Sequence, residues 1–147
     1  MFLYCFVLRV AAIFAVCVLF SASLSSAFAL EGTQRAEIKN PRLANSFGET
    51  VSQNVNTHQQ VQISADVANK QTTPQVFVYI VQIEGSNGVT HKLTWISASL
   101  NAGQTLSPAI SWTPNRPGSY VANMYVWDSI KDANALAVPI SYKITVS

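Results

Sequence analysis

The sequence predicts an all-β protein, an antiparallel β-sandwich of about seven strands behind a cleavable leader. From Gln59 to the carboxyl terminus, apolar and polar residues alternate with a period of two, as in strands with one buried face. Clusters of glycine, proline and asparagine separate the alternating segments. No segment of this region has the 3.6-residue period of a helix. These three observations together favour a sandwich of short strands.

The amino terminus has the pattern of a secretory signal peptide. Residues 10–20 form an apolar run that follows Arg9, and a serine-rich stretch then leads to Ala27, Phe28 and Ala29. As a helix, the run would rise only about 16 Å, well short of the ~30 Å hydrocarbon core of a bilayer. We therefore expect residues 1–29 to be a signal peptide cleaved after Ala29. The alternative is that residues 1–20, interrupted only by Arg9, remain as an uncleaved membrane anchor.

Both cysteines, Cys5 and Cys17, lie within this leader. Val16 precedes Cys17, where a bacterial lipoprotein signal has a small residue, so lipidation is disfavoured. The mature chain is expected to contain no thiol, no disulfide and no cysteine-based metal centre. Its stability must come from its hydrophobic core.

Composition excludes several classes of protein. The chain has 147 residues, 49% of them hydrophobic and 11% charged. Removing residues 1–29 takes away one basic residue, Arg9, and leaves a nearly neutral chain. Because the chain has too few lysine and arginine residues to form a strongly basic surface, we expect no nucleic-acid partner. Disorder is disfavoured by the low net charge and by the many aromatic and β-branched residues.

We expect one domain. Residues 30–37 are assigned to an amino-terminal extension and residues 38–147 to the sandwich. The most charged stretch of the chain lies in residues 31–42, and residues 38–43 and 50–53 are expected to supply a split first strand. Charges in this stretch would also protect a sheet edge.

The next three expected strands cover residues 59–67, 75–84 and 89–97. In the first, residues such as Val61 and Ile63 alternate with polar ones, whereas residues 75–84 are apolar on both faces and should be central. Residues 85–88 read Gly-Ser-Asn-Gly, a hairpin signal. In the third strand, strict alternation places four side chains on one face, namely Val89, His91, Leu93 and Trp95.

Three more strands are expected at residues 105–113, 120–127 and 138–146. In the first of these, Leu106, Ile110 and Trp112 are in phase. Residues 120–127 alternate without exception. Pro139 lacks an N–H group, so the last strand should begin at an edge or carry a bulge there.

The segment that links the first two of these strands resembles the E–F corner of immunoglobulin-like and fibronectin-III-like domains. The residues that carry this resemblance are Trp112, Thr113, Pro114, Pro117, Gly118, Ser119 and Tyr120. Over residues 38–147 the chain is similar to immunoglobulin-like modules of secreted and surface proteins of archaea, notably ammonia-oxidising lineages. That wider likeness rests on residues 40–43, 46–48, 60–65, 79–82, 95–96 and 125–127. It implies an immunoglobulin-like β-sandwich, with the Tyr120 hydroxyl making a stabilising corner hydrogen bond. Unlike antibody domains, this chain cannot form the disulfide between strands B and F.

No catalytic or metal constellation is recognisable. His58 and His91 are the only side chains of the mature chain that titrate near neutral pH, and both are expected to be ordinary surface residues. A blue-copper site would need a thiolate besides Met124 and these histidines. Asp128 and Asp132 are expected to lie in a polar turn rather than a calcium loop. We expect no enzyme activity, no metal and no cofactor.

Tyr125 and Trp127 share the face of their strand opposite Tyr120 and Met124. If that face is open, the two rings form a contact surface for a glycan or a protein. The alternative is that a loop or a neighbouring strand covers them.

The sequence therefore predicts a secreted or cell-surface, non-enzymatic immunoglobulin-like module for adhesion, ligand binding or protein assembly. Its partner would be a protein or a surface glycan, and a homo-oligomer is possible on this reading. The protein would be attached to a membrane only if residues 1–29 are not cleaved. Two alternatives are a filament subunit, with residues 30–58 or the last strand taking part in strand addition, and a carbohydrate-binding module.

Overall fold

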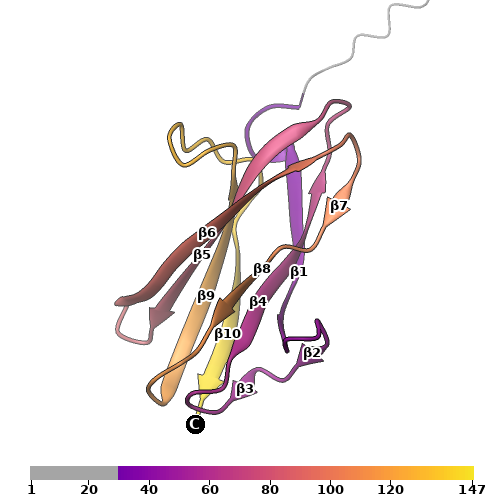
Figure 1. Cartoon of the computed structure of the whole chain (residues 1–147). Coiled ribbons are helices and arrows are strands. Elements are labelled where there is room, and N and C mark those ends of the chain that lie inside the picture. Colours follow the sequence, from indigo (N-terminus) through magenta and orange to yellow (C-terminus); the bar gives the residue numbers. More distant parts are fainter. Residues whose placement is uncertain (1–29) are drawn as a thin grey trace, which may run out of the picture.

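The computed structural model describes residues 30–147, which form two β-sheets packed face to face (Figure 1). The predicted leader and its cleavage site lie outside the described residues. A 3-10 turn, η2 (Gly32–Gln34), precedes the strands. These are β1 (Ala36–Ala44), β2 (Thr50–Val51), β3 (Asn54–Val55), β4 (Val61–Asn69), β5 (Gln75–Gly85), β6 (Thr90–Leu100), β7 (Thr105–Leu106), β8 (Ala109–Trp112), β9 (Gly118–Trp127) and β10 (Ile140–Val146).

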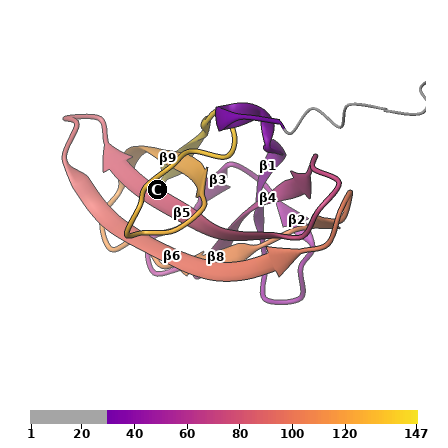
Figure 2. The same cartoon turned by 90° about the horizontal axis from the view of Figure 1, so that it is seen from above.

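The first sheet has the order β2-β1-β4-β7, with β8 also paired to β4, and the second has the order β3-β10-β9-β5-β6. Only the short contact between β3 and β10 is parallel. Seen from above, the two sheets form two layers, and β6 runs along one margin of the sandwich (Figure 2). The predicted antiparallel immunoglobulin-like β-sandwich is confirmed. The six long strands and the interrupted β7–β8 segment make up the expected seven, and β2 and β3 are short additions.

The core lies between the sheets, and β5 supplies its centre. β5 is hydrogen-bonded to β6 on one side and to β9 on the other, as its apolar pattern predicts. Its inward side chains are almost fully buried: Phe77, Tyr79, Val81 and Ile83.

Two polar residues of β4 are buried against expectation. Ser64 alternates with the apolar residues of this strand, which predicts an exposed side chain, and Asn69 begins a polar segment that is typical of a turn. Their side chains are nevertheless only 4% and 1% exposed. The Asn69 side-chain amide donates hydrogen bonds to the carbonyl oxygens of Thr73, Leu100 and Asn101, at 2.8, 3.3 and 3.1 Å. Burial of Asn69 is therefore compensated, and this residue ties two turns of the chain together.

Proline and local pairing shift several strand boundaries. The expected strand at residues 105–113 is broken between β7 and β8, where Pro108 interrupts it, and Leu106 stays 40% exposed. β10 begins at Ile140, directly after Pro139, so no ladder donor is lost. β1 begins at Ala36, two residues before the expected start of the domain.

A β-bulge interrupts the alternation at the start of β6. Ile83 pairs with Lys92 and Glu84 pairs with Thr90, which leaves His91 as an extra residue on β6. The predicted common face of His91, Leu93 and Trp95 is therefore wrong. The His91 ring packs edge-on against Tyr120, with 5.3 Å between ring centroids.

Within residues 30–147, no helix has the length and apolar character needed to cross a lipid bilayer.

Candidate functional site

The alternation of β9 gives its two faces different surroundings. Tyr120, Ala122, Met124 and Val126 are buried between the sheets. The intervening residues, including Tyr125 and Trp127, point to the outer face of the second sheet and are half-buried. β9 is central in its sheet, but no third layer among the described residues covers that outer face.

Strand pairing brings a third aromatic residue to this face. Ile80 of β5 pairs with Trp95 of β6 on one side and with Tyr125 of β9 on the other. Residues directly opposite each other in neighbouring strands share a face. Trp95 is therefore level with Tyr125, although thirty positions separate them in the chain.

We call the outer surface formed by Leu93, Trp95, Tyr125 and Trp127 the aromatic face. Trp95 is 50% exposed and Leu93 58% exposed, whereas Ile80, which lies between the rings, is only 4% exposed. The Tyr125 and Trp127 rings lie 6.2 Å apart, tilted by 58°. The rings of the aromatic face thus cover Ile80, while part of each ring stays open to solvent.

A polar network borders the aromatic face on the same side of the sheet. The Tyr125 hydroxyl donates to Gln82 Oε1 at 3.1 Å, and Gln82 Nε2 donates to Glu84 Oε1 at 2.9 Å. Asn123 Nδ2 donates to Glu84 Oε2 at 3.0 Å, and the Ser141 hydroxyl donates to Asn123 Oδ1 at 2.7 Å. The network fixes the Tyr125 ring and sets amide and hydroxyl groups beside the aromatic rings.

Sequence reasoning found Tyr125 and Trp127 but missed Trp95 and Leu93. Strict alternation placed Leu93 and Trp95 on one face with His91. No pattern within a single strand shows that β6 and β9 lie on either side of β5. The bulge at His91 could have been suspected from the glycine-rich hairpin just before it, since extra residues often accompany such turns.

The expected corner is a buried aromatic junction between the two sheets. Trp112 of β8 and Tyr120 of β9 are 5% and 6% exposed, with ring centroids 5.2 Å apart. The Tyr120 hydroxyl donates to the carbonyl oxygen of Arg116 at 3.0 Å, which is the hydrogen bond expected for it.

The connection between these strands contains the other corner residues. The Pro114 carbonyl oxygen accepts a hydrogen bond from the His58 N–H group at 2.7 Å. Gly118 follows Pro117 and has φ 148°, a conformation that favours glycine. The contacts of the corner are thus internal to the fold.

Two shallow pockets adjoin the corner, with volumes of about 330 and 230 Å³. Both are lined by His91 and Tyr120. Lys92 lines one and Arg116 the other, and no carboxylate lines either of them. In the first pocket, Lys92 Nζ already donates to the Ser111 carbonyl oxygen at 3.0 Å.

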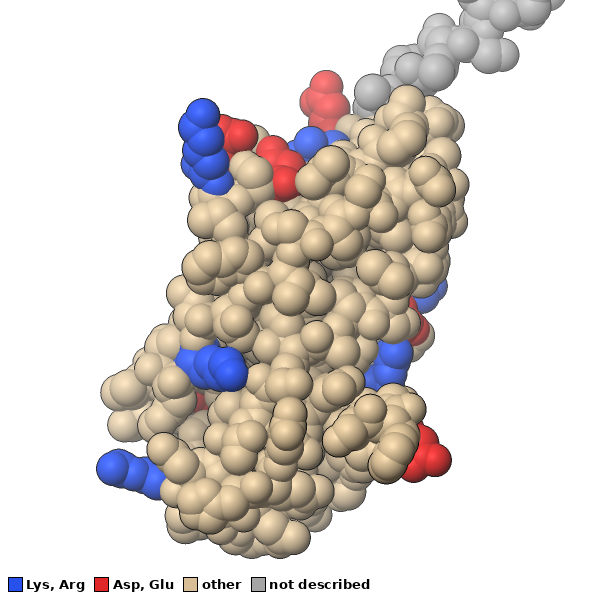
Figure 3. Space-filling model, in the orientation of Figure 1, with Lys and Arg blue, Asp and Glu red and all other residues tan. Residues whose placement is uncertain are grey.

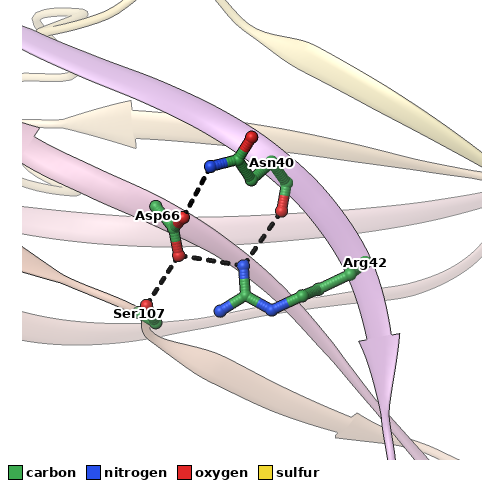
Figure 4. A network of polar contacts seen from close by, with 4 residues as sticks. All are labelled: Asn40, Arg42, Asp66 and Ser107. Atoms are coloured by element: carbon green, nitrogen blue, oxygen red, sulfur yellow. Dashed lines mark hydrogen bonds and ion pairs between the residues drawn. The ribbon is translucent and has the colours of Figure 1, made fainter. Parts of the chain in front are cut away.

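On the first sheet, a charged network fixes the bulge of β1 (Figure 4). The Asp66 carboxylate accepts hydrogen bonds from Asn40 Nδ2, Arg42 Nη1 and the Ser107 hydroxyl, at 2.8, 2.9 and 2.7 Å. The Asn40 bond, followed by those from Ser107 and Arg42, outweighs partial desolvation and lowers the pKa of Asp66 to about 2. Every partner of this carboxylate belongs to the fold, so the network is structural.

The remaining candidates are satisfied locally. Asp128 accepts hydrogen bonds from the backbone and side chain of Asn134, chiefly the side-chain amide, and these bonds lower its pKa. Asp132 Oδ2 accepts a hydrogen bond from the Ser129 hydroxyl at 3.1 Å. These contacts are those of a polar turn. In the part of the chain that the structure describes, no three His, Cys, Asp or Glu side chains come together as metal ligands.

Charged side chains are sparse on the side of the molecule where β6 and β8 face the viewer. Figure 3 shows that most of the central area of this side is uncharged and that the acidic and basic residues stand mainly at its margins. Lys92 is the only charged residue of β6.

No family model and no curated protein matches the chain. Among solved structures, the C-terminal domain of wzt has a TM-score of 0.66 and 14% identity over 80% of this chain and 76% of that one. The CARDB domain of a Pyrococcus furiosus protein, solved in complex with di-metal ions, has a TM-score of 0.52 and 20% identity, covering 80% and 94%. A Paenibacillus cycloisomaltooligosaccharide glucanotransferase has a TM-score of 0.57 and 19% identity, covering 76% of this chain but 14% of that enzyme. At these identities the likeness establishes the immunoglobulin-like fold alone.

Proposed function

We propose that this chain is a non-enzymatic binding module that acts outside the cell or at its surface, and that it holds its ligand on the aromatic face. The leader pattern of residues 1–29 supports the location, as does the resemblance to secreted archaeal modules. On this proposal residues 1–29 are removed and residues 30–147 form the working domain. The immunoglobulin-like fold is compatible with a binding or assembly role but does not specify one.

One observation carries the proposal: Trp95, Tyr125 and Trp127 lie together on an open sheet face, beside a polar network whose one charged member is Glu84. Exposed tryptophan and tyrosine side chains are the residues that most often dominate binding energy. They lose little conformational entropy on binding because their side chains have only two rotatable bonds. Contiguous exposed apolar surface of this kind is typical of interaction sites.

The border of the aromatic face indicates the chemistry of the ligand. Amide and hydroxyl groups of Gln82, Asn123 and Ser141 lie beside the rings, and Glu84 is already held by Gln82 and Asn123. Aromatic rings that cover apolar patches, next to uncharged hydrogen-bonding groups, fit a neutral polysaccharide better than an anionic one. A surface glycan is therefore the ligand that we favour, and a partner protein is the second candidate.

Tryptophan fluorescence tests this proposal. The purified protein is titrated with neutral and anionic polysaccharides while emission is followed, since two of its three tryptophans lie on the aromatic face. We expect a shift in emission with a neutral polysaccharide, and a loss of affinity of about tenfold or more in Trp95→Ala and in Trp127→Ala.

Leu106→Ala is the matched control, because Leu106 is an exposed apolar residue on the other sheet. It should bind as the parent does. Unchanged affinity in both tryptophan variants would show that the aromatic face is not the site. If no polysaccharide binds, but a surface protein does so in a manner that depends on Trp95 and Trp127, the second candidate replaces the first.

A further inference from the structure

The sandwich has four lateral edges, and three of them are closed against further strands. The β1 edge carries Pro41, the bulge between Lys39 and Arg42, and the short cover of β2. The β10 edge begins after Pro139, bears Lys143 and is covered at its end by β3. Proline, bulges, charges and short strands are the devices that keep sheet edges from pairing.

The third closed edge is the interrupted one formed by β7 and β8. Pro108 separates the two short strands, so there is no continuous run of backbone donors and acceptors. The Ser111 carbonyl oxygen on this edge is also occupied, because it accepts a hydrogen bond from Lys92 Nζ at 3.0 Å.

The β6 edge differs from all three. β6 has eleven residues, and its pairing with β5 is unbroken from Lys92 to Leu100. It contains no proline, and its one charge is at Lys92, near its start. In an antiparallel sheet, every second residue of an edge strand directs its N–H and C=O groups away from its neighbour. Within the described residues, β5 is the only strand that pairs with β6.

We propose that two copies of this chain associate through β6, in an antiparallel pair about a twofold axis. The pair would join the second sheet of one copy to the second sheet of the other, forming one continuous sheet. Self-pairing suits this strand because its only charge is far from its middle. Centred near Ile96, the pair sets Lys92 opposite the partner's Leu100 and Trp95 opposite the partner's Ser97, so no like charges meet.

The partner is a second copy, and the assembly closes at two. An isologous contact uses the same surface on both chains and leaves nothing open for a third. A filament by strand addition would need a second long edge, which residues 30–147 do not present. Residues 30–58 were expected as a possible donated strand, but β1, the long strand within them, is already paired with β4 inside the domain. A single strand pair buries an area at the low end for stable complexes, so the dimer should be concentration-dependent.

The dimer would also affect ligand binding, in so far as the proposed function holds. A twofold axis perpendicular to the joined sheet keeps both aromatic faces on the same side. A polymer that reaches both faces would bind more tightly than a short oligosaccharide, because its second contact is intramolecular.

Sedimentation velocity and amide hydrogen exchange test the dimer. With the protein expressed from its complete sequence and purified, the sedimenting mass should rise from one chain to two as concentration increases from micromolar to near-millimolar. At low concentration alternate amides of β6 should exchange quickly, and at high concentration they should become protected.

Ile96→Lys places a charge in the middle of the edge and should keep the protein monomeric. Ser97→Lys, at an exposed position, is the second variant in case the first does not fold, and it should weaken association about tenfold. Ser86→Lys makes the same substitution in the β5–β6 hairpin and should associate as the parent does.

A single-chain mass at every concentration would overturn the proposal, as would dimerisation of both β6 variants at parental strength. Polymers longer than two chains would overturn the closed geometry. Neither β6 variant alters Trp95, Tyr125 or Trp127. Glycan binding by a monomeric Ile96→Lys protein therefore tests the proposed function independently of the dimer.

Discussion

The two sheets of the sandwich present different outer surfaces. The first sheet carries Glu37, Lys39, Arg42 and Asp66 on β1 and β4, and these charges pair with one another or with Lys70. The second sheet has Leu93, Trp95, Tyr125 and Trp127 in the corresponding place. One surface is satisfied by contacts within the chain. The other keeps aromatic rings and the backbone groups of β6 open to solvent, and this difference is the basis of both proposals made above.

The strongest way to sharpen this comparison is to remove one tryptophan from the junction between the sheets and one from the open face. Trp112→Ala should lower the free energy of unfolding by about 3–5 kcal/mol, because it leaves a cavity against Tyr120 in the core. Trp95→Ala should cost only about 1 kcal/mol, since half of that side chain is already in water. Urea unfolding of both variants measures the difference. Equal losses would mean that the aromatic face also stabilises the fold.

Substitutions of two buried tyrosines should have smaller effects on the free energy of unfolding, and these effects should have opposite signs. Tyr120→Phe removes the hydrogen bond to Arg116 and should cost about 1 kcal/mol, lowering the melting temperature without altering glycan binding. The Tyr79 hydroxyl is buried and has no hydrogen-bond partner among the described residues. Tyr79→Phe should therefore stabilise the protein by about 1 kcal/mol. An unchanged melting curve for Tyr120→Phe would count against the corner role.

The smallest effect concerns the charged network of the first sheet. Because folding lowers the pKa of Asp66 from 3.8 to about 2, its contribution is complete above about pH 5 and is lost as pH falls from 4 toward 2. Asp66→Asn should reduce stability by less than about 1 kcal/mol at neutral pH. The gap between parent and variant should shrink as pH falls below about 4 and close below about pH 2. A gap that stays constant from pH 7 to pH 2 would exclude the carboxylate as its source.

Much of the fold could be predicted from the sequence because alternation is a local property. The buried set of β9 and the central position of β5 both follow from patterns within a single strand. Tyr120 was assigned its hydrogen bond from the motif around it. Tyr125 and Trp127 were recognised as one surface because they lie two residues apart on the same strand.

The candidate site was only half predictable, because it is assembled by pairing. Trp95 joins Tyr125 through Ile80 of β5, a strand that is next to β6 in the chain but far from β9. Alternation within β6 carries no information about which strand pairs with β5 on its other side. The bulge at His91 redirected one side chain that strict alternation had misplaced. Pro108 broke a strand that looked continuous.

The sequence by itself determined most of the apolar core, since burial of apolar side chains follows from hydrophobicity and the two-residue period of a strand. Only the tertiary structure decided that β6 is an edge, that three other edges are closed, and that three aromatic rings share one open face. Strand order depends on contacts between residues far apart in the chain. Those contacts form only when the two sheets pack together and exclude water from the space between them.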